Sequence, residues 1–224
     1  MLQRGLVCTL GAPVAVGLLA LSARGNVVVG SSSNFNDGDQ QGWTNGVAND
    51  PQVLPGGPGG ASDPYLRVTS DGSGPGGKLT VFNNLETWTG RWLTAGITTV
   101  EMDLRNFDPQ NRTLSIRMGF LASAGPGQGG WSTQAFSLPA DGQWHRAVFT
   151  ISQATMVSVN SPLDWTTAME SVSQLRIFHS VNPSATGVNI NSSIGIDNIV
   201  ALPAPGATVC LGAAGMLGLR RRRV

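Results

Sequence analysis

Three tryptophans have the residue type and spacing to bind a sugar. Trp88 and Trp92 lie four residues apart in "ETWTGRW", and Trp131 follows a glycine-rich stretch. An indole ring offers a wide, flat apolar face with a polar edge, on which a sugar ring can stack. We therefore expect a carbohydrate-binding platform of Trp88, Trp92 and Trp131. The alternative is that these rings fold down onto the hydrophobic core.

Residue patterns for catalysis are weak by comparison. The histidines, His145 and His179, lie within predicted strands, and no H-E-x-x-H or G-x-S-x-G pattern surrounds a candidate. A glycosidase needs two opposed carboxylates. Glu101 and Asp103 alternate onto one face of a strand, but the run "VEMDLR" is typical of a solvated face. We therefore predict that the protein is not an enzyme.

The two ends of the chain have the features of export and anchoring signals. Residues 1–25 place Arg4 before an apolar run that small residues follow, the pattern of a secretory signal peptide. Near the C-terminus, residues 207–219 form a short apolar run before four arginines. Positive charges beyond an apolar helix mark the cytoplasmic side of a membrane. The pattern predicts an N-terminal signal helix, an exported domain at 26–202 and a C-terminal transmembrane helix.

Residues 203–224 resemble the PEP-CTERM sorting signal of exosortase-processed bacterial proteins. A Pro-Glu-Pro-like motif, a weakly apolar helix and an arginine cluster follow one another, although Ala204 stands in place of the glutamate. The matching residues are Pro203, Ala204, Pro205, Arg220, Arg221, Arg222 and Arg223. The resemblance implies an exosortase-type processing enzyme as partner, transient anchoring in the membrane, and release to the cell surface or matrix. The alternative is a tail anchor that is never cleaved.

Charge and cysteine content argue against nucleic-acid binding and against disulfide bonds in the domain. Six of the 14 Lys and Arg residues lie in the terminal segments, whereas all 13 Asp and Glu residues lie inside 26–202, so the domain has a net charge of about −5. An acidic domain without a basic stripe argues against nucleic acid as a partner. Both cysteines, Cys8 and Cys210, also lie in the terminal segments. Disulfides therefore do not hold the domain together.

Alternating apolar and polar residues predict an all-β domain. In "TTVEMDLRNF" the apolar Val100, Met102 and Leu104 alternate with charged residues, and in "TLSIRMGF" every second residue is apolar, which is the pattern of a half-buried strand. Further strands are predicted at "PYLRV", "KLTVFN", "STQAFSL", "WHRAVFTI", "QLRIFHS" and "SIGIDNIVAL", and a short helix at "SPLDWTTAMESV" with Ser161 as its N-cap. Gly- and Pro-rich links separate the strands. This arrangement predicts an antiparallel β-sandwich, a jelly roll.

The segments "NFNDGDQQGWT", "DGQWHRAVFTI" and "IGIDNIVAL" resemble jelly-roll domains of the galactose-binding-like and laminin B-like kind. In such domains a structural calcium often joins the first strand to the last. The matching oxygen-bearing residues are Asn36, Asp37, Asp39 and Asp197. The resemblance therefore implies a calcium clamp between the two ends of the domain. The alternative is that Asp37 and Asp39 belong to an ordinary polar turn.

Two functions agree with these features. The first is a non-enzymatic exported surface or extracellular-matrix protein, sorted through its C-terminal signal. The second is a carbohydrate-binding module of the jelly-roll type, with extracellular polysaccharide as its partner.

The C-terminal resemblance predicts a processed protein. Mass spectrometry of the exported protein should find a mature C-terminus near Pro205, because the processing enzyme would remove the apolar helix and the arginines. Exported protein that always retains Arg220 to Arg223 would contradict this prediction.

Overall fold

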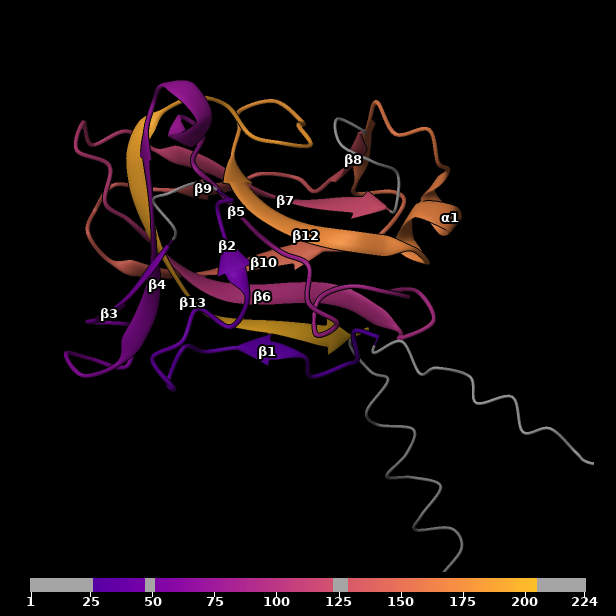
Figure 1. The fold of residues 1–224 in the computed structure, drawn as a ribbon, viewed down its shortest axis with the longest axis horizontal. Helices are drawn as coiled ribbons and strands as arrows, with labels where there is room; N and C mark the ends of the chain where they lie inside the picture. Colours follow the sequence, from indigo (N-terminus) through magenta and orange to yellow (C-terminus); the bar gives the residue numbers. More distant parts are fainter. Residues whose placement is uncertain (1–25, 47–50, 123–128, 205–224) are drawn as a thin grey trace, which may run out of the picture.

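Two antiparallel β-sheets pack face to face (Figure 1). The computed structural model describes residues 26–46, 51–122 and 129–204. Sheet A has the order β10-β6-β13-β4-β3, with β1 also paired to β13. Its strands are β1 (Ser32–Ser33), β3 (Gln52–Pro55), β4 (Pro64–Asp71), β6 (Ile97–Asn106), β10 (Trp144–Thr150) and β13 (Asn191–Pro203).

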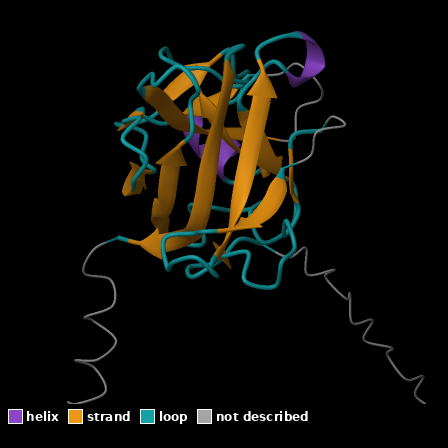
Figure 2. Ribbon diagram, turned by 90° about the vertical axis from the view of Figure 1, so that its left-hand side faces the viewer, coloured by secondary structure: helices purple, strands orange, loops and turns teal. Residues whose placement is uncertain are grey.

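Sheet B has the order β11-β8-β7-β12-β5-β2, with β9 also paired to β7. Its strands are β2 (Trp43–Thr44), β5 (Thr80–Asn83), β7 (Leu114–Ala122), β8 (Gly130–Ser132), β9 (Phe136–Leu138), β11 (Val157–Val159) and β12 (Val172–His179). A 3₁₀ turn, η1 (Gly74–Gly76), and one short helix, α1 (Trp165–Met169), complete the described elements. Strands and loops account for nearly all of the fold (Figure 2).

The predicted all-β sandwich is confirmed in its two antiparallel sheets, and the long strands lie where alternation placed them. The run "STQAFSL" is divided between β8 and β9, and β1, β2, β3 and β11 were not predicted. The short helix begins three residues later than expected. Asp164, not Ser161, is its N-cap, because the Asp164 side chain accepts a hydrogen bond from the backbone N–H of Thr167 at 3.0 Å.

The last strand lies in the interior of sheet A. β13 pairs with β6 along one edge and with β4 along the other, and β1 adds to it near its end. Gly30 N donates to the Ala201 carbonyl at 2.8 Å, and Ala201 N donates to the Ser31 carbonyl at 2.9 Å. The first and last strands of the domain are therefore joined by backbone hydrogen bonds, and both described ends leave from the same end of the sandwich (Figure 1).

The predicted terminal signals fall mostly outside the described residues. Residues 1–25, Pro205 and Arg220 to Arg223 are not among them, whereas Pro203 ends β13 and Ala204 follows it. Within 26–46, 51–122 and 129–204, no helix is long and apolar enough to span a membrane.

A buried serine joins the first strand to the aromatic core. The Ser33 hydroxyl accepts hydrogen bonds from the indole N–H of Trp43 at 3.1 Å and of Trp88 at 3.0 Å. Ser33 is 2% exposed, and both rings are fully buried. A buried donor without a partner lowers folding stability by about 1–3 kcal/mol. The Ser33 hydroxyl prevents this loss for two indole N–H groups at once.

Ser33→Ala should lower the free energy of unfolding by roughly 2–4 kcal/mol, because it leaves two buried indole N–H groups unpaired. Urea denaturation followed by tryptophan fluorescence measures the loss. The neighbouring Ser32, which is exposed, supplies a matched control, and Ser32→Ala should change stability by less than about 0.5 kcal/mol. Equal effects of the two substitutions would contradict the role assigned to Ser33.

Candidate functional site

The predicted platform of Trp88 and Trp92 is wrong, because the structure places both rings in the core. Each is 0% exposed. The four-residue spacing does stack them, with ring centroids 6.4 Å apart and an interplanar angle of 27°. However, Trp92 and Phe120 meet edge to face inside the sandwich, with ring centroids 4.9 Å apart. Burial of two large indoles stabilises the fold and leaves no face for a sugar.

Trp131 lies apart from these two rings. It belongs to β8, is half-buried, and meets Trp165 of α1 edge to face at 5.3 Å. The three predicted platform residues are therefore not assembled into one surface. The alternative considered for them, loop residues folded onto the core, describes Trp88 and Trp92.

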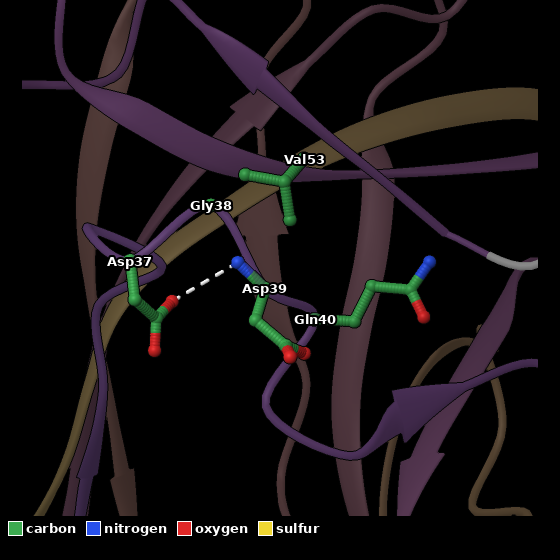
Figure 3. A pocket seen from close by; sticks show the side chains of 5 residues that line it. All are labelled: Asp37, Gly38, Asp39, Gln40 and Val53. Carbon is green, nitrogen blue, oxygen red and sulfur yellow. Dashed lines mark hydrogen bonds between the residues drawn. The ribbon is translucent and has the colours of Figure 1, made fainter.

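The structure also does not assemble the predicted calcium clamp. Asp37 accepts a hydrogen bond from the Asp39 amide at 3.0 Å, and together with Gly38, Gln40 and Val53 they line a shallow pocket (Figure 3). Across the described ranges, no three His, Cys, Asp or Glu side chains form a group that could hold a metal ion.

The other two predicted ligands have separate positions. Asn36 is exposed and donates its backbone N–H to the Asn34 side chain at 3.3 Å, whereas Asp197 is buried in β13. The described residues therefore do not bring the predicted ligands together as one group, and backbone pairing between β1 and β13 joins the first and last strands.

The outer face of sheet A carries a different group of side chains, which the strand register brings together. Gly195 in β13 lies opposite Arg67 of β4 on one side and Arg105 of β6 on the other. Arg105 in turn lies opposite Trp144 of β10. Residues directly opposite each other point to the same face of a sheet, so one row runs across four strands.

Gly195 makes room for an aromatic pair at the middle of this row. A Cβ there would lie 2.8 Å from Trp144 Cη2 and 3.0 Å from Tyr65 Cδ2, closer than side-chain contacts allow. Because the position has no side chain, the two rings meet edge to face with centroids 5.2 Å apart. The Trp144 indole also donates to the Gly56 carbonyl at 3.3 Å, so the β3–β4 loop borders this pair.

Two arginines flank the next aromatic ring. The guanidinium carbons of Arg67 and Arg105 lie 4.1 Å and 4.8 Å from the centroid of Phe107, within the range of cation–π attraction. Phe107 also stacks on Tyr65, with centroids 5.9 Å apart. Neither arginine forms an ion pair within the described part of the chain. We call the whole surface the aromatic–arginine face, and it comprises Tyr65, Arg67, Arg105, Phe107, Trp144 and Asp197.

Two buried polar atoms of this face have no hydrogen-bond partner among the described residues. They are Arg105 Nε, a donor, and Asp197 Oδ2, an acceptor when ionised. Asp197 is 1% exposed, and its other oxygen accepts from the Asn198 amide at 2.7 Å. Burial, together with the negative charges of Asp63 and Asp103, raises the pKa of Asp197 to about 7. Unpaired buried polar groups are rare and call for an explanation.

Trp144 stands at the end of the predicted strand "WHRAVFTI", where a large apolar ring fits a core position, but the structure places it elsewhere. Trp144 is half-buried on the outer face, while Ala147, Phe149 and Ile151 point inward. Alternation counted back from these three residues puts Trp144 outside. The alternation in "WHRAVFTI" therefore indicates the outward position of Trp144, although a tryptophan at a strand end also fits the core.

No family model and no curated protein matches the chain. Solved structures resemble it in fold. A family 11 carbohydrate-binding module from Clostridium thermocellum, in complex with a β-1,3-1,4-mixed-linked tetrasaccharide, is 12% identical, with a TM-score of 0.48, and the match covers 79% of this chain and 98% of that one. The N-terminal cellulose-binding domain of Cellulomonas fimi β-1,4-glucanase C is 12% identical, with a TM-score of 0.41, over 80% and 97%.

An exo-β-agarase is 10% identical, with a TM-score of 0.52 and 77% of this chain covered. The match spans 24% of the agarase chain. At these identities the likeness extends to the fold alone.

The raised pKa of Asp197 predicts a pH-dependent stability. Between pH of about 4 and about 7 the unfolded chain has lost this proton while the folded chain retains it, so the free energy of unfolding should fall as pH rises through this window. Urea denaturation at intervals from pH 4 to 8 measures it. In Asp197→Asn, which has no carboxyl to titrate, the free energy of unfolding should fall by roughly 2–4 kcal/mol less over this pH range than in the native protein.

The exposed Glu86 provides the control for this experiment, and Glu86→Gln should keep the native profile. An Asp197→Asn profile parallel to that of the native protein would show that Asp197 does not hold its proton on folding.

Proposed function

We propose that the chain is a non-catalytic carbohydrate-binding protein that holds an extracellular polysaccharide on the aromatic–arginine face. One observation carries the proposal. The Tyr65–Trp144 pair over Gly195 lies on the same sheet face as Arg105 and Asp197, each of which has a buried polar atom without a partner.

The aromatic residues suit the apolar part of a sugar. One face of a pyranose ring presents C–H groups, which pack on a flat indole or phenyl ring. Trp144 and Phe107 are both half-buried, so part of each ring stays available, whereas Tyr65 is 5% exposed and packs against both. The hydrogen bond from Trp144 to Gly56 fixes the indole in place before a ligand arrives. A ring held in advance loses little conformational freedom on binding.

The polar groups suit sugar hydroxyls. A hydroxyl oxygen accepts hydrogen bonds, so it can bind the N–H groups of the half-buried Arg67 and Arg105. Arg67 stays in place because its Nε donates to Ser193 Oγ at 2.5 Å. Sites of this composition, a few convergent polar groups beside aromatic rings, are typical of small-molecule pockets.

The carboxylates near the face favour binding over catalysis. Glu101 lies 2.8 Å and Asp103 3.4 Å from Arg146, so both are held by the same guanidinium. Neither is free to act as an acid or a base opposite the other. We therefore propose no reaction.

The proposal agrees with the names of the similar structures, which include a carbohydrate-binding module and an agarase. Because that likeness is one of fold, the support for this function comes from the residues of the aromatic–arginine face. Export to the cell surface, as the terminal segments predict, would bring the domain to its polysaccharide.

A glycan array should identify the polysaccharide, and calorimetry with that ligand should test the face. Trp144→Ala should weaken binding about tenfold or more, which corresponds to about 1.4 kcal/mol, because it removes half of the aromatic pair. Trp131→Ala provides the matched control, since Trp131 is a half-buried tryptophan on sheet B, and it should bind like the native protein. Native-like binding by Trp144→Ala, with the fold intact by circular dichroism, would contradict the proposed face.

A further inference from the structure

A second site lies on the opposite sheet. The outer face of sheet B has a pocket of about 180 Å³, lined by Gly76, Lys78, Thr80, Phe82, Arg176 and Thr186 among others. A water molecule occupies about 30 Å³ in the liquid, so this space corresponds to roughly six waters. It is large enough for one charged group of a ligand together with part of the ring that carries it.

The geometry of β5 and β12 places residues of this pocket on the same face of sheet B. Thr80 and Phe82 are two residues apart in β5 and so point to the same face, while Leu79 and Val81 are fully buried on the other. Arg176 of β12 lies directly opposite Phe82 and places its guanidinium carbon 5.8 Å from the ring centroid. The pocket therefore has an aromatic floor beside a cation.

Both cations of the pocket are held by neutral groups. Lys78 Nζ donates to Thr186 Oγ1 at 2.9 Å. Arg176 donates through Nε to the Gln174 side chain at 2.5 Å and through Nη1 to the Ala185 carbonyl at 3.1 Å. These bonds orient the two groups without neutralising them, and donors remain on both.

Among the described residues, no carboxylate lines the pocket, and neither cation forms an ion pair with any of them. Elsewhere in this acidic domain, three arginines are each paired with a carboxylate: Arg91 with Glu170, Arg112 with Asp108, and Arg146 with Glu101. Two cations that line one pocket and form no ion pair create a local positive site in a domain whose net charge is negative.

Partial burial strengthens this site. Desolvation lowers the pKa of Arg176, although a guanidinium stays charged at any physiological pH. A half-buried cation that has lost water gains more from an anionic partner than an exposed one does, because the local dielectric is lower.

We propose that this pocket binds an anionic group, a carboxylate or a sulfate ester, carried by an acidic saccharide. The anion contacts Lys78 and Arg176, and the sugar ring that carries it lies against Phe82. The site goes beyond the proposed function and does not depend on the aromatic–arginine face, because it lies on the other sheet and uses other residues.

The experiment measures binding of the full chain to three soluble polymers by calorimetry at low salt. Polygalacturonate supplies carboxylates, dextran sulfate supplies sulfate esters, and dextran is the neutral control. The native protein should bind at least one acidic polymer and should bind dextran at least tenfold more weakly. Binding to polygalacturonate alone identifies a carboxylate as the ligand group, and binding to dextran sulfate alone identifies a sulfate ester.

Variants then locate the site. Lys78 is exposed, so Lys78→Gln should fold normally and weaken binding of the acidic polymer about fivefold or more, while Lys78→Arg should retain it. Arg91→Gln removes one positive charge elsewhere and should have little effect. Trp144→Ala, which damages the face on sheet A, should also bind the acidic polymer normally, so failure of one proposal is distinguishable from failure of the other.

Two results would overturn the inference. One is equal binding of the acidic polymer by Lys78→Gln and the native protein. The other is an affinity for both acidic polymers no greater than that for dextran.

Discussion

The hydrogen bonding of β13 on both of its edges is the constraint on which the rest of the structure depends. This strand ends at Pro203, yet it lies inside sheet A between β4 and β6. Ser193 bonds to the Val68 carbonyl across 125 positions of sequence. Sheet A therefore forms only when the last part of the domain meets parts made much earlier. A fold dominated by such distant pairs forms slowly, because the loops must close before their contacts contribute. Backbone pairing of β1 with the same strand then holds both ends of the domain.

The same strand sets up the aromatic–arginine face. Gly195 lets Tyr65 and Trp144 approach each other across the sheet, and two residues later Asp197 is buried without a full set of hydrogen bonds. Both features weaken a strand when considered alone, since glycine has no side chain to pack and a buried carboxyl loses its hydration. They are compatible with a stable fold because the inner face of β13 packs Ile194, Ile196, Ile199 and Ala201 into the core. Departures from good local packing of this kind tend to lie at functional sites.

The two outer faces of the sandwich use their charges differently. On sheet A, Arg146 is neutralised by acidic neighbours while Arg67 and Arg105 stack on a ring. On sheet B, Lys78 and Arg176 are held by hydroxyl, amide and carbonyl groups. The two proposed sites, one for a sugar and one for an anionic group, would therefore lie on different sheets of one small domain. Two separate sites on one chain can bind a polymer more tightly than either alone when the polymer reaches both.

Alternating hydrophobicity in the sequence was enough to predict the all-β sandwich and every strand of seven residues or more. Short strands such as β1 and β2, with two residues each, have no period to detect, and partners far along the chain define them. The spacing of Trp88 and Trp92 predicted that their rings would share a direction, and they do stack. Whether that direction was inward or outward was decided by the core, because only the packed sandwich sets which side excludes water. Trp144 reached the outer face for the same reason, and its meeting with Tyr65 required the register of four strands. A sequence carries the period of a strand, but the neighbours of a side chain depend on the partners that tertiary packing selects.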